Sequence, residues 1–509
     1  MKRLLILWDP RNPIVPVAPV LEALKAQPDV QVKVLTFQDI GHPTLPNGAF
    51  NLPAGAGGEM PDGMLWIEGG PLPGNLEAFS CPKACWLVNT VHEPSLLGEV
   101  RTRFDLIFSA SLRDTAGEKA LWLPLAGESG GRIDVPAGLS VLVADPKPPL
   151  QVEIEHLLAS GGREYGRPSV PVVLTLGNGG QPHPLLFDCL RAGAAVVADP
   201  ETDLRGLAHV GEHLDVFPSK EELPQYLHTL LGDSEKLSRL AARGPAIMEH
   251  LHEPELRARR IIEGLWPRVR ILSGQDHCPR VSILVTCYRY LRRFRVCLES
   301  LARQTLPPAS LEIVVADPES PDGLAEALEQ FAEQYPEIRV VHVPLDPRYH
   351  RNRGLGINRA CEASRGPVVI AIDGDLVFPP SLIGLLEESV RREPGHVYGI
   401  RRSFVGRSET ERILNGELDP FTDFDRLSRS EGDGETQPFV GVLGYCQAVA
   451  RAAFARARYP EEFDVVNQSD IVFVERLRKE AQVTPKYLAE ETALHLWHPR
   501  NWQGTSESL

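Results

Sequence analysis

The sequence predicts an α/β protein made of three successive units, each built on a mostly parallel sheet. Short apolar runs rich in β-branched residues recur along the 509 residues and end in small or polar residues. Helical patterns or loops separate these runs, which is typical of open parallel sheets. The alternation is clearest from Val281 onward. The predicted units comprise residues 1–145, 146–268 and 281–509, with a linker over residues 269–280.

Composition and charge exclude several classes of protein. Hydrophobic residues make up 43% and charged residues 24% of the chain, as in ordinary globular proteins. The net charge of −15 argues against a binding surface for nucleic acid. No apolar run approaches the roughly 18 residues that span a bilayer, although peripheral association with a membrane stays open. The eight cysteines are scattered among apolar neighbours, so we expect reduced thiols in a cytoplasmic protein.

The first unit begins with an apolar run over residues 2–8, which predicts a strand. A helix is expected over residues 20–26, and a second strand over residues 30–37. Residues 41–62 are rich in proline and glycine and indicate a loop. Further strands are predicted at residues 64–70, 84–90 and 104–110.

The second unit has a strand that runs into a glycine-rich turn at Asn178–Gly180. This turn is either a cradle of backbone amides for phosphate or an ordinary turn without a ligand, and we favour the ordinary turn. A helix and a strand are expected within residues 185–200, followed by another strand and helix within residues 213–233. Residues 234–265 have a strongly helical pattern.

The third unit shows the order βαβαβαβ. Its first helix is amphipathic, with apolar residues at helical spacing. Residues 400–437 are polar and rich in glycine and aspartate, which predicts a flexible or lid-like segment. The expected strands lie at residues 281–288, 311–320, 338–345 and 368–372, and the helices between them at residues 291–304, 324–335 and 353–364.

The fourth of these strands ends in Asp373-Gly374-Asp375. Open α/β sheets bind ligands at the carboxyl ends of their strands. Carboxylates at positions i and i+2 can share one divalent cation, which can also bind the phosphate oxygens of a substrate. The same three residues are also typical of a turn that binds no ligand. The two interpretations, a metal–diphosphate site and a solvated turn, are both open on this motif alone.

From Val281 to about residue 500, the order of segments resembles family-2 glycosyltransferases of the GT-A fold. The closest stretch is HRNRGLGINRACEASRGPVVIAIDGD, similar to the family's Arg-Asn-x-Gly helix and its metal-binding Asp-x-Asp. LEIVVADPESPDG is similar to the second strand, but only Asp317 and Ser320 match the family's Asp-Asp-Gly-Ser. GVLGYCQAVARAAF resembles the acceptor segment. NQSDIVFVERL is similar to the family's Glu-Asp-x-x-x-x-x-Arg-Leu segment, with Ser469 in place of the glutamate and Asp470 retained. ALHLWHP resembles the terminal segment containing histidine.

This resemblance implies a nucleotide-diphosphate sugar donor and a Mn²⁺ or Mg²⁺ cofactor. It implies that Asp470 is the general base and that Gly441 and Gly444 contact the acceptor. The residues implied to bind the nucleotide sugar are Thr286, Tyr288, Asp317, Arg351, Asn352 and Asp373. The residues implied to hold the metal are Asp373, Asp375, His495 and His498.

Several of these residues also have a structural interpretation. Asp470 precedes a helical stretch and so can act as a helix N-cap. The two histidines can lie on a strand-to-loop edge without binding a metal. Arg351 either binds phosphate or caps a neighbouring element, and Tyr288 either stacks on the nucleotide base or is half-buried in the fold.

Part of the N-terminal half resembles the C-terminal domain of GT-B glycosyltransferases of the spore-maturation-protein type. The resemblance rests on LFDCLRAGAAVVADPETDLRGLAHVGEHLDVF and on the helical ARGPAIMEHLHEPELRARRIIEGL. That family commonly has a glutamate where Asp188 stands here. We therefore expect a GT-B-like pair of Rossmann-like domains followed by a GT-A-type domain. The N-terminal half is either an intact transferase or a degenerate one that binds or docks the acceptor, and we favour the second.

The sequence thus predicts a metal-dependent, inverting glycosyltransferase. Its acceptor is expected to be a glycan, a lipid-linked saccharide or a protein. Two alternatives stay open: an enzyme in which both halves are catalytic, and a non-catalytic glycan-binding or scaffold protein that keeps the fold. The sugar, the nucleotide base and the oligomeric state are not fixed by the sequence.

Overall fold

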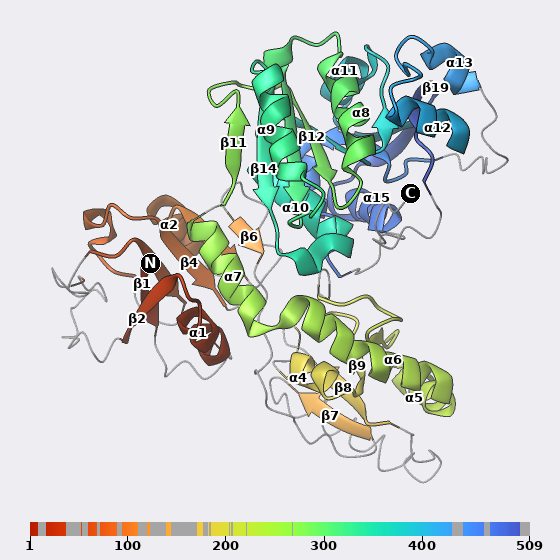
Figure 1. Cartoon of the computed structure of the whole chain (residues 1–509). Helices are drawn as coiled ribbons and strands as arrows, with labels where there is room; N and C mark the ends of the chain where they lie inside the picture. The colour runs from red at the N-terminus through yellow and green to blue at the C-terminus, as the bar shows by residue number, and fades with distance from the viewer. Residues whose placement is uncertain are drawn as a thin grey trace. The chain divides into compact units, whose positions relative to one another are not determined.

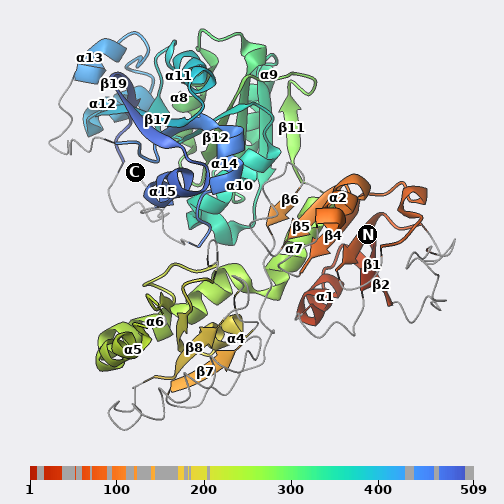
Figure 2. The same ribbon diagram turned by 180° about the vertical axis from the view of Figure 1, so that it is seen from behind.

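The computed structural model divides the chain into two compact units, Met1–Pro267 and Arg268–Leu509. Figures 1 and 2 show the helices and strands of each unit from opposite sides. Among the described residues, no helix has both the length and the apolar character needed to cross a membrane. The structure describes residues 1–8, 17–36, 52, 60–68, 72–88, 94–109, 120–122, 139–143, 170–176, 182, 185–202, 204, 207–219, 221–266, 268–429, 441–462 and 469–498.

The first unit contains a parallel sheet with strand order β2-β1-β3-β4-β5-β6. The five strands predicted for this region are present, and β6 (Ala120–Trp122) is an addition. Helices α1 (Ala18–Lys25) and α2 (Pro94–Arg103) belong to the same part of the chain. The other strands are β1 (Lys2–Trp8), β2 (Val30–Thr36), β3 (Gly63–Ile67), β4 (Lys83–Leu87) and β5 (Leu106–Ser109).

A second parallel sheet of the first unit has the order β10-β9-β8-β7. The predicted phosphate-cradle or turn segment Asn178–Gly180 lies outside the described residues. The strands are β7 (Leu139–Val143), β8 (Val172–Leu176), β9 (Ala195–Ala198) and β10 (Asp215–Val216), and the helices are α4 (Leu186–Arg191), α5 (Leu223–Gly232) and α6 (Ser234–Ile247).

The helical stretch predicted over residues 234–265 is interrupted. After α6 comes a π-helical turn, Met248–His252, and Glu253 is extended with φ −67° and ψ 142°. Helix α7 (Pro254–Leu265) then begins with a proline, which lacks the N–H that a continuous helix would use.

Helix α7 follows the second sheet in sequence but packs on the first. Its Ala258, Ile261 and Leu265 are buried in one cluster with Leu4 and Leu65 of the first sheet. The last helix of the first unit therefore packs against the sheet that contains the first strand of the chain. The two Rossmann-like sheets agree with the predicted GT-B-like layout.

The second unit has one mixed sheet of nine strands, ordered β11-β14-β13-β12-β15-β18-β17-β19-β16. Strands β14, β13, β12 and β15 are parallel neighbours, whereas β11 and β18 join this group antiparallel. The strands are β11 (Arg270–Ser273), β12 (Val281–Thr286), β13 (Leu311–Asp317), β14 (Arg339–Pro344), β15 (Val368–Ile372), β16 (Leu376–Val377), β17 (His396–Phe404), β18 (Cys446–Ala450) and β19 (Thr484–His495).

Two predictions for this unit need correction. The predicted linker, residues 269–280, contains β11, which pairs with β14 and so belongs to the sheet. The predicted flexible segment, residues 400–437, is regular over much of its length: it includes the end of β17, α12 (Arg407–Leu414) and α13 (Phe424–Arg429). Residues 430–440 lie outside the described residues.

Helices cover both faces of this sheet. Helices α8 (Leu291–Ala302), α9 (Leu324–Gln334) and α11 (Leu382–Arg392) share a buried core with the alternate residues Val281 and Ile283 of β12. Figure 1 shows these helices in front of the sheet. Seen from behind, in Figure 2, the other face carries α10 (Arg353–Ala363), α14 (Arg451–Ala457) and α15 (Ser469–Glu480).

The parallel register brings three loops to one edge of this sheet. Thr286, at the end of β12, pairs with Ala316 of β13, and Val285 pairs with Ile372 of β15. The segments that follow these strands, including Asp373–Asp375, therefore leave the sheet together, as the sequence predicts for a ligand site.

Candidate functional site

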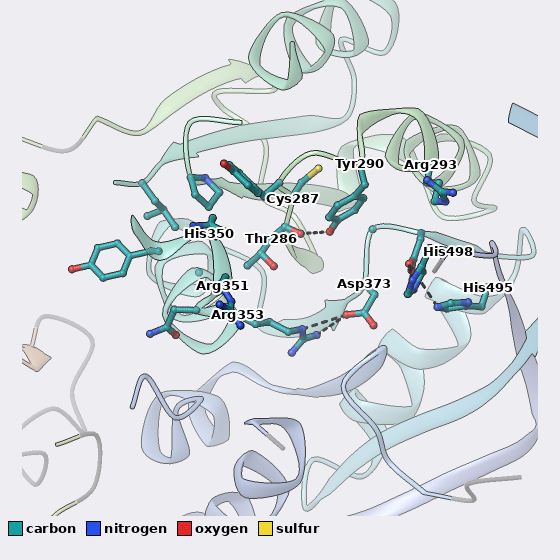
Figure 3. Close-up of a pocket in the computed structure, with 18 of the residues that line it drawn as sticks. Thr286, Cys287, Tyr290, Arg293, His350, Arg351, Arg353, Asp373, His495 and His498 are labelled. Carbon is teal, nitrogen blue, oxygen red and sulfur yellow. Dashed lines mark hydrogen bonds and ion pairs between the residues drawn. The ribbon is translucent and has the colours of Figure 1, made fainter. Parts of the chain in front are cut away.

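A cavity of about 350 Å³ lies at this edge of the sheet in the second unit. Its walls come from the loops after β12, β13 and β15, the start of α10, and strands β17 and β19. Figure 3 shows Asp373 with Arg353 on one side and the two histidines on the other. Among the predicted site residues, the cavity is lined by Thr286, Tyr288, Arg351, Asn352, Asp373, Asp375, His495 and His498.

The Asp375 carboxylate faces two imidazole rings. Its Oδ2 lies 3.6 Å from Nε2 of His495 and 3.4 Å from Nε2 of His498. One ligand atom from each of the three residues lies within 4.8 Å of the others. Asp375 Oδ1 and His495 Nδ1 are buried and have no hydrogen-bond partner among the described residues. A set of one carboxylate and two imidazoles with unpartnered buried atoms fits a divalent transition metal such as Mn²⁺.

Burial also favours the form of His495 that can bind a metal. It lowers the pKa of His495 to about 4, although the Asp375 carboxylate opposes the shift. The ring is therefore neutral at physiological pH. A neutral imidazole is the form that binds a metal ion.

The Asp373 carboxylate has different neighbours. Its Oδ1 lies 3.3 Å from Nε of Arg353. The Nη2 atom of the same guanidinium donates to the carbonyl of Gly444. Burial raises the pKa of Asp373, Arg353 opposes that rise, and the Asp375 carboxylate adds to it. Arg353 was not among the predicted site residues, because the resemblance pointed to Arg351, two positions earlier.

Asp470 lies in the first turn of α15 and accepts a hydrogen bond from the Gly444 N–H at 2.6 Å. A Cβ atom added to Gly444 would lie 2.7 Å from the Cβ of Asp470, so the two backbones approach closely here. A Cβ atom at Gly441 would meet open space. None of these three residues lines the cavity itself, but Gly444 is joined to the cavity wall by Arg353.

Residues 282–454 match the family model described as glycosyl transferase family 2. These matched residues, 282–454, form the family 2 region of the chain. In the first unit, residues 167–263 match the model described as glycosyl transferase-like. The family 2 region contains the strand end with Asp373 and Asp375, whereas Asp470, His495 and His498 follow it in sequence.

Individual relatives match only part of this chain, and the match covers only part of each relative. The uncharacterized glycosyltransferase EpsJ of Bacillus subtilis is 30% identical over 147 residues, which are 27% of this chain and 40% of EpsJ. The uncharacterized glycosyltransferase YibD of Escherichia coli is 32% identical over 105 residues, or 20% and 28% of the two chains. This chain therefore spans less than half the length of either relative.

Among solved structures, the mannosyltransferase PcManGT from Pyrobaculum calidifontis, in complex with GDP-Man and Mn²⁺, is similar to this chain. The match has a TM-score of 0.33 and 20% identity, and it covers 51% of this chain and 68% of that one.

Within the family 2 region, two predicted donor-binding residues make contacts inside the fold, although Asn352 also lines the cavity. Asp317 is 3% exposed, accepts from the Ser320 N–H at 2.7 Å and lies 2.9 Å from His342 Nε2. Asn352 caps α10 by accepting from the Leu355 N–H at 2.9 Å, and its amide donates to the Glu461 carbonyl at 2.7 Å. The structure thus favours roles in the fold for both side chains.

The other predicted donor contacts face the cavity. The Tyr288 ring lies 4.8 Å from the His350 ring, and Arg289 Cζ lies 5.1 Å from the centre of the Tyr288 ring. The Thr286 carbonyl accepts from the Tyr290 hydroxyl, a contact drawn in Figure 3. Tyr288 itself lines the cavity, as the predicted contact with a nucleotide base requires.

Sequence reasoning also missed Arg402, on β17. Its guanidinium Cζ lies 4.6 Å from the centre of the Tyr445 ring and 4.7 Å from that of Phe404, and it lines the cavity. Arg402 lies outside the quoted motifs. The pairing of β17 with β18 and β19 brings it to the site.

Proposed function

We propose that the second unit is a metal-dependent, inverting glycosyltransferase whose donor is a nucleotide-diphosphate sugar. The observation that supports this proposal most strongly is the gathering of Asp375, His495 and His498 in one cavity, at a strand end within a region of glycosyl transferase family 2. The relatives named above are glycosyltransferases as well.

The cavity offers suitable groups for the donor. Arg351 and Arg402 carry positive charge on its wall and complement a diphosphate. Tyr288 presents an aromatic ring on which a uracil or guanine base can stack. In this proposal the diphosphate lies near Asp375, and the base lies near Tyr288.

Asp375, His495 and His498 would hold the divalent cation, and the two nitrogen ligands favour Mn²⁺ over Mg²⁺. When bound, such a cation neutralises charge on the departing nucleoside diphosphate. Asp373 lies next to this group of ligands and is proposed to contact the donor, either directly or through water.

Asp470 is proposed to act as the general base. The acceptor hydroxyl gives its proton to the Asp470 carboxylate while the acceptor oxygen forms a bond to the anomeric carbon. The bond from that carbon to the diphosphate oxygen breaks, and its electron pair leaves with the nucleotide. Because this is a single displacement, the anomeric configuration is inverted. The acceptor is proposed to be a glycan, a lipid-linked saccharide or a protein.

The first unit is proposed to bind or dock the acceptor rather than to catalyse. Asp188, which stands where the resembling GT-B family commonly has a glutamate, is only 3% exposed within α4. A carboxylate buried in this way is poorly placed to contact a substrate.

All eight cysteines are free thiols, and this supports the proposed cytoplasmic location.

Hydrolysis of a panel of UDP- and GDP-sugars with Mn²⁺ tests the proposal. We expect the wild type to hydrolyse at least one donor, Asp375→Asn to be slower by on the order of 100-fold, and Asp188→Asn to match the wild type. Activity that survives Asp375→Asn but not Asp188→Asn would move the chemistry to the first unit. Losses in both variants would favour an enzyme with two catalytic halves. A wild type that neither binds nor hydrolyses any donor would favour a glycan-binding scaffold.

A further inference from the structure

We propose that Arg353 is a positioning residue, which fixes Gly444 and thereby the Asp470 carboxylate relative to Asp373 at the end of β15. This inference rests on the proposed function and deepens it, because it names the part that couples the donor side of the site to the general base. Arg353 occupies the variable position of the Arg-Asn-x-Gly segment, so the resemblance assigns it no role.

The first link joins Arg353 to two segments that are far apart in the sequence. Arg353 is the first residue of α10, and its side chain is 7% exposed. Its guanidinium lies 3.3 Å from Asp373 Oδ1 and donates to the Gly444 carbonyl. Dashed lines in Figure 3 mark the contact with Asp373. One planar group thus holds both the end of β15 and the segment before β18.

Gly444 carries the link onward to Asp470. Its carbonyl accepts from Arg353, and its N–H donates to Asp470 Oδ2 at 2.6 Å. The lack of a side chain is required, since a Cβ atom would lie 2.7 Å from the Cβ of Asp470. A displacement of Gly444 would therefore displace one oxygen of the proposed base.

A second route joins Arg353 to the helix that carries Asp470. The Arg353 Cζ lies 5.3 Å from the centre of the Tyr459 ring. Tyr459 in turn stacks on Phe473 of α15, with ring centres 4.1 Å apart and planes inclined by 15°. The Tyr459 hydroxyl also bonds to Gln447, whose amide donates to the Asp470 carbonyl at 3.3 Å.

The charge of Arg353 fits the same role. Burial lowers the pKa of Arg353, but the Tyr459 hydroxyl and the Asp373 and Asp470 carboxylates outweigh this effect and raise it. The guanidinium therefore lies in the field of both carboxylates and stays charged. Within the described residues its one ion pair is with Asp373. A lysine would keep the charge but lacks the fork that holds two partners at once.

Hydrogen exchange tests the link without depending on activity. In Arg353→Lys we expect the Gly444 amide to exchange at least about tenfold faster, because its carbonyl anchor is lost. Amides of β12 and α8 should keep their wild-type rates. The matched control is Arg359→Lys, on the same helix, where the side chain pairs with Glu362 at 3.3 Å. An unchanged Gly444 rate in Arg353→Lys would overturn the inference.

Kinetics test whether the link acts through the base. With Mn²⁺ and the donor that the wild type hydrolyses, Arg353→Lys should lower kcat at least tenfold, whereas the Kd for the matching nucleoside diphosphate should change less than threefold. An equal loss of nucleotide affinity would overturn the inference, since Arg353 would then be a donor contact. A wild type without hydrolysis would instead contradict the proposed function, and the Gly444 exchange rate would still decide the link.

A double-mutant cycle provides the sharpest comparison. If Arg353 acts through Asp470, then Arg353→Lys should lower the residual rate of Asp470→Asn by no more than about twofold. The same change should cost the full tenfold in the wild-type background. If Arg353→Lys lowers the rate by the same factor in the wild-type and Asp470→Asn backgrounds, the two residues act independently. This outcome would contradict a positioning role and would indicate a general effect of the substitution, such as lost stability.

Discussion

Two aspartates that stand two positions apart have unlike surroundings. Asp375 lies beside the imidazoles of His495 and His498, whereas Asp373 lies beside the guanidinium of Arg353. A cation is attracted to the first environment, which offers a carboxylate and two imidazole nitrogens, and is repelled by the positive charge in the second. The motif Asp-x-Asp therefore does not consist of two equivalent ligands in this chain.

This difference predicts unequal effects on metal affinity. Asp375→Asn should weaken Mn²⁺ binding by about tenfold or more, because it removes a charged ligand next to two imidazoles. Asp373→Asn should weaken it by a smaller factor, since that carboxylate is already paired. Titration with Mn²⁺, followed by the electron paramagnetic resonance signal of the free ion, measures both. Equal weakening would mean that the two carboxylates share the ion.

The close approach of Gly444 to Asp470 gives a second prediction. Gly444→Ala would place a methyl group 2.7 Å from the Cβ of Asp470, so one of the two backbones must move. We expect hydrolysis of the donor to fall by at least about tenfold, from loss of the 2.6 Å bond to the base. Gly395→Ala is the control, because a Cβ atom there meets nothing within 4 Å. Wild-type activity in Gly444→Ala would exclude a tight coupling.

The sequence could supply only part of the site. The resemblance predicts Asp373, Asp375, His495 and His498 as metal ligands, and the structure places the last three within reach of one ion. The surroundings of Asp317 and Asn352 could not be foreseen, since their partners His342 and Glu461 are 25 and 109 positions away. Contacts between such distant residues depend on the tertiary fold, which local patterns do not encode.

At the scale of elements, the strands of the parallel sheets were the most predictable feature. A strand buried on both faces is a continuous apolar run, such as Val368–Ile372, and such runs are easy to recognise. Strand β11 was mistaken for a linker because it is four residues long and two of its side chains are exposed. Its pairing with β14 on the sheet edge is a tertiary contact that its own composition does not show.

The packing of α7 on the first sheet gives a third prediction. A Cβ atom at Gly264 would lie 2.5 Å from Leu106 Cδ2 and 2.6 Å from Phe108 Cζ. Because Phe108 is fully buried, we expect Gly264→Ala to lower the free energy of unfolding of the first unit by about 1–3 kcal/mol.

Gly98→Ala, in α2, is the matched control. A Cβ atom there meets nothing within 4 Å, so alanine should raise the free energy of unfolding by up to about 1 kcal/mol through helix propensity. Urea unfolding followed by hydrogen exchange in peptides of β1 and β3 reports both variants. The same sign of change in the two variants would contradict the packing of α7 described here.

At the scale of the whole molecule, each unit has its own hydrophobic cores. The cores that include Leu4 and Leu174 lie in the first unit, and the core that includes Val281 lies in the second. The described cavity with the metal-ligand candidates is built entirely from residues of the second unit. The proposed ligands of the cation, Asp375, His495 and His498, are therefore residues of the second unit.

This separation predicts that ligand binding stabilises the two units unequally. A ligand that binds only the folded second unit, at 100 times its Kd, should raise that unit's free energy of unfolding by about 2.7 kcal/mol. With Mn²⁺ and UDP or GDP, we therefore expect slower hydrogen exchange in peptides of β15 and α10. Peptides of β1 and β9 in the first unit should keep their rates. At the same ligand concentration Asp375→Asn should reduce the protection, because the cation would lose its charged ligand. Protection in the first unit that persists in Asp375→Asn would mean that this unit binds the nucleotide itself, which would favour two catalytic halves.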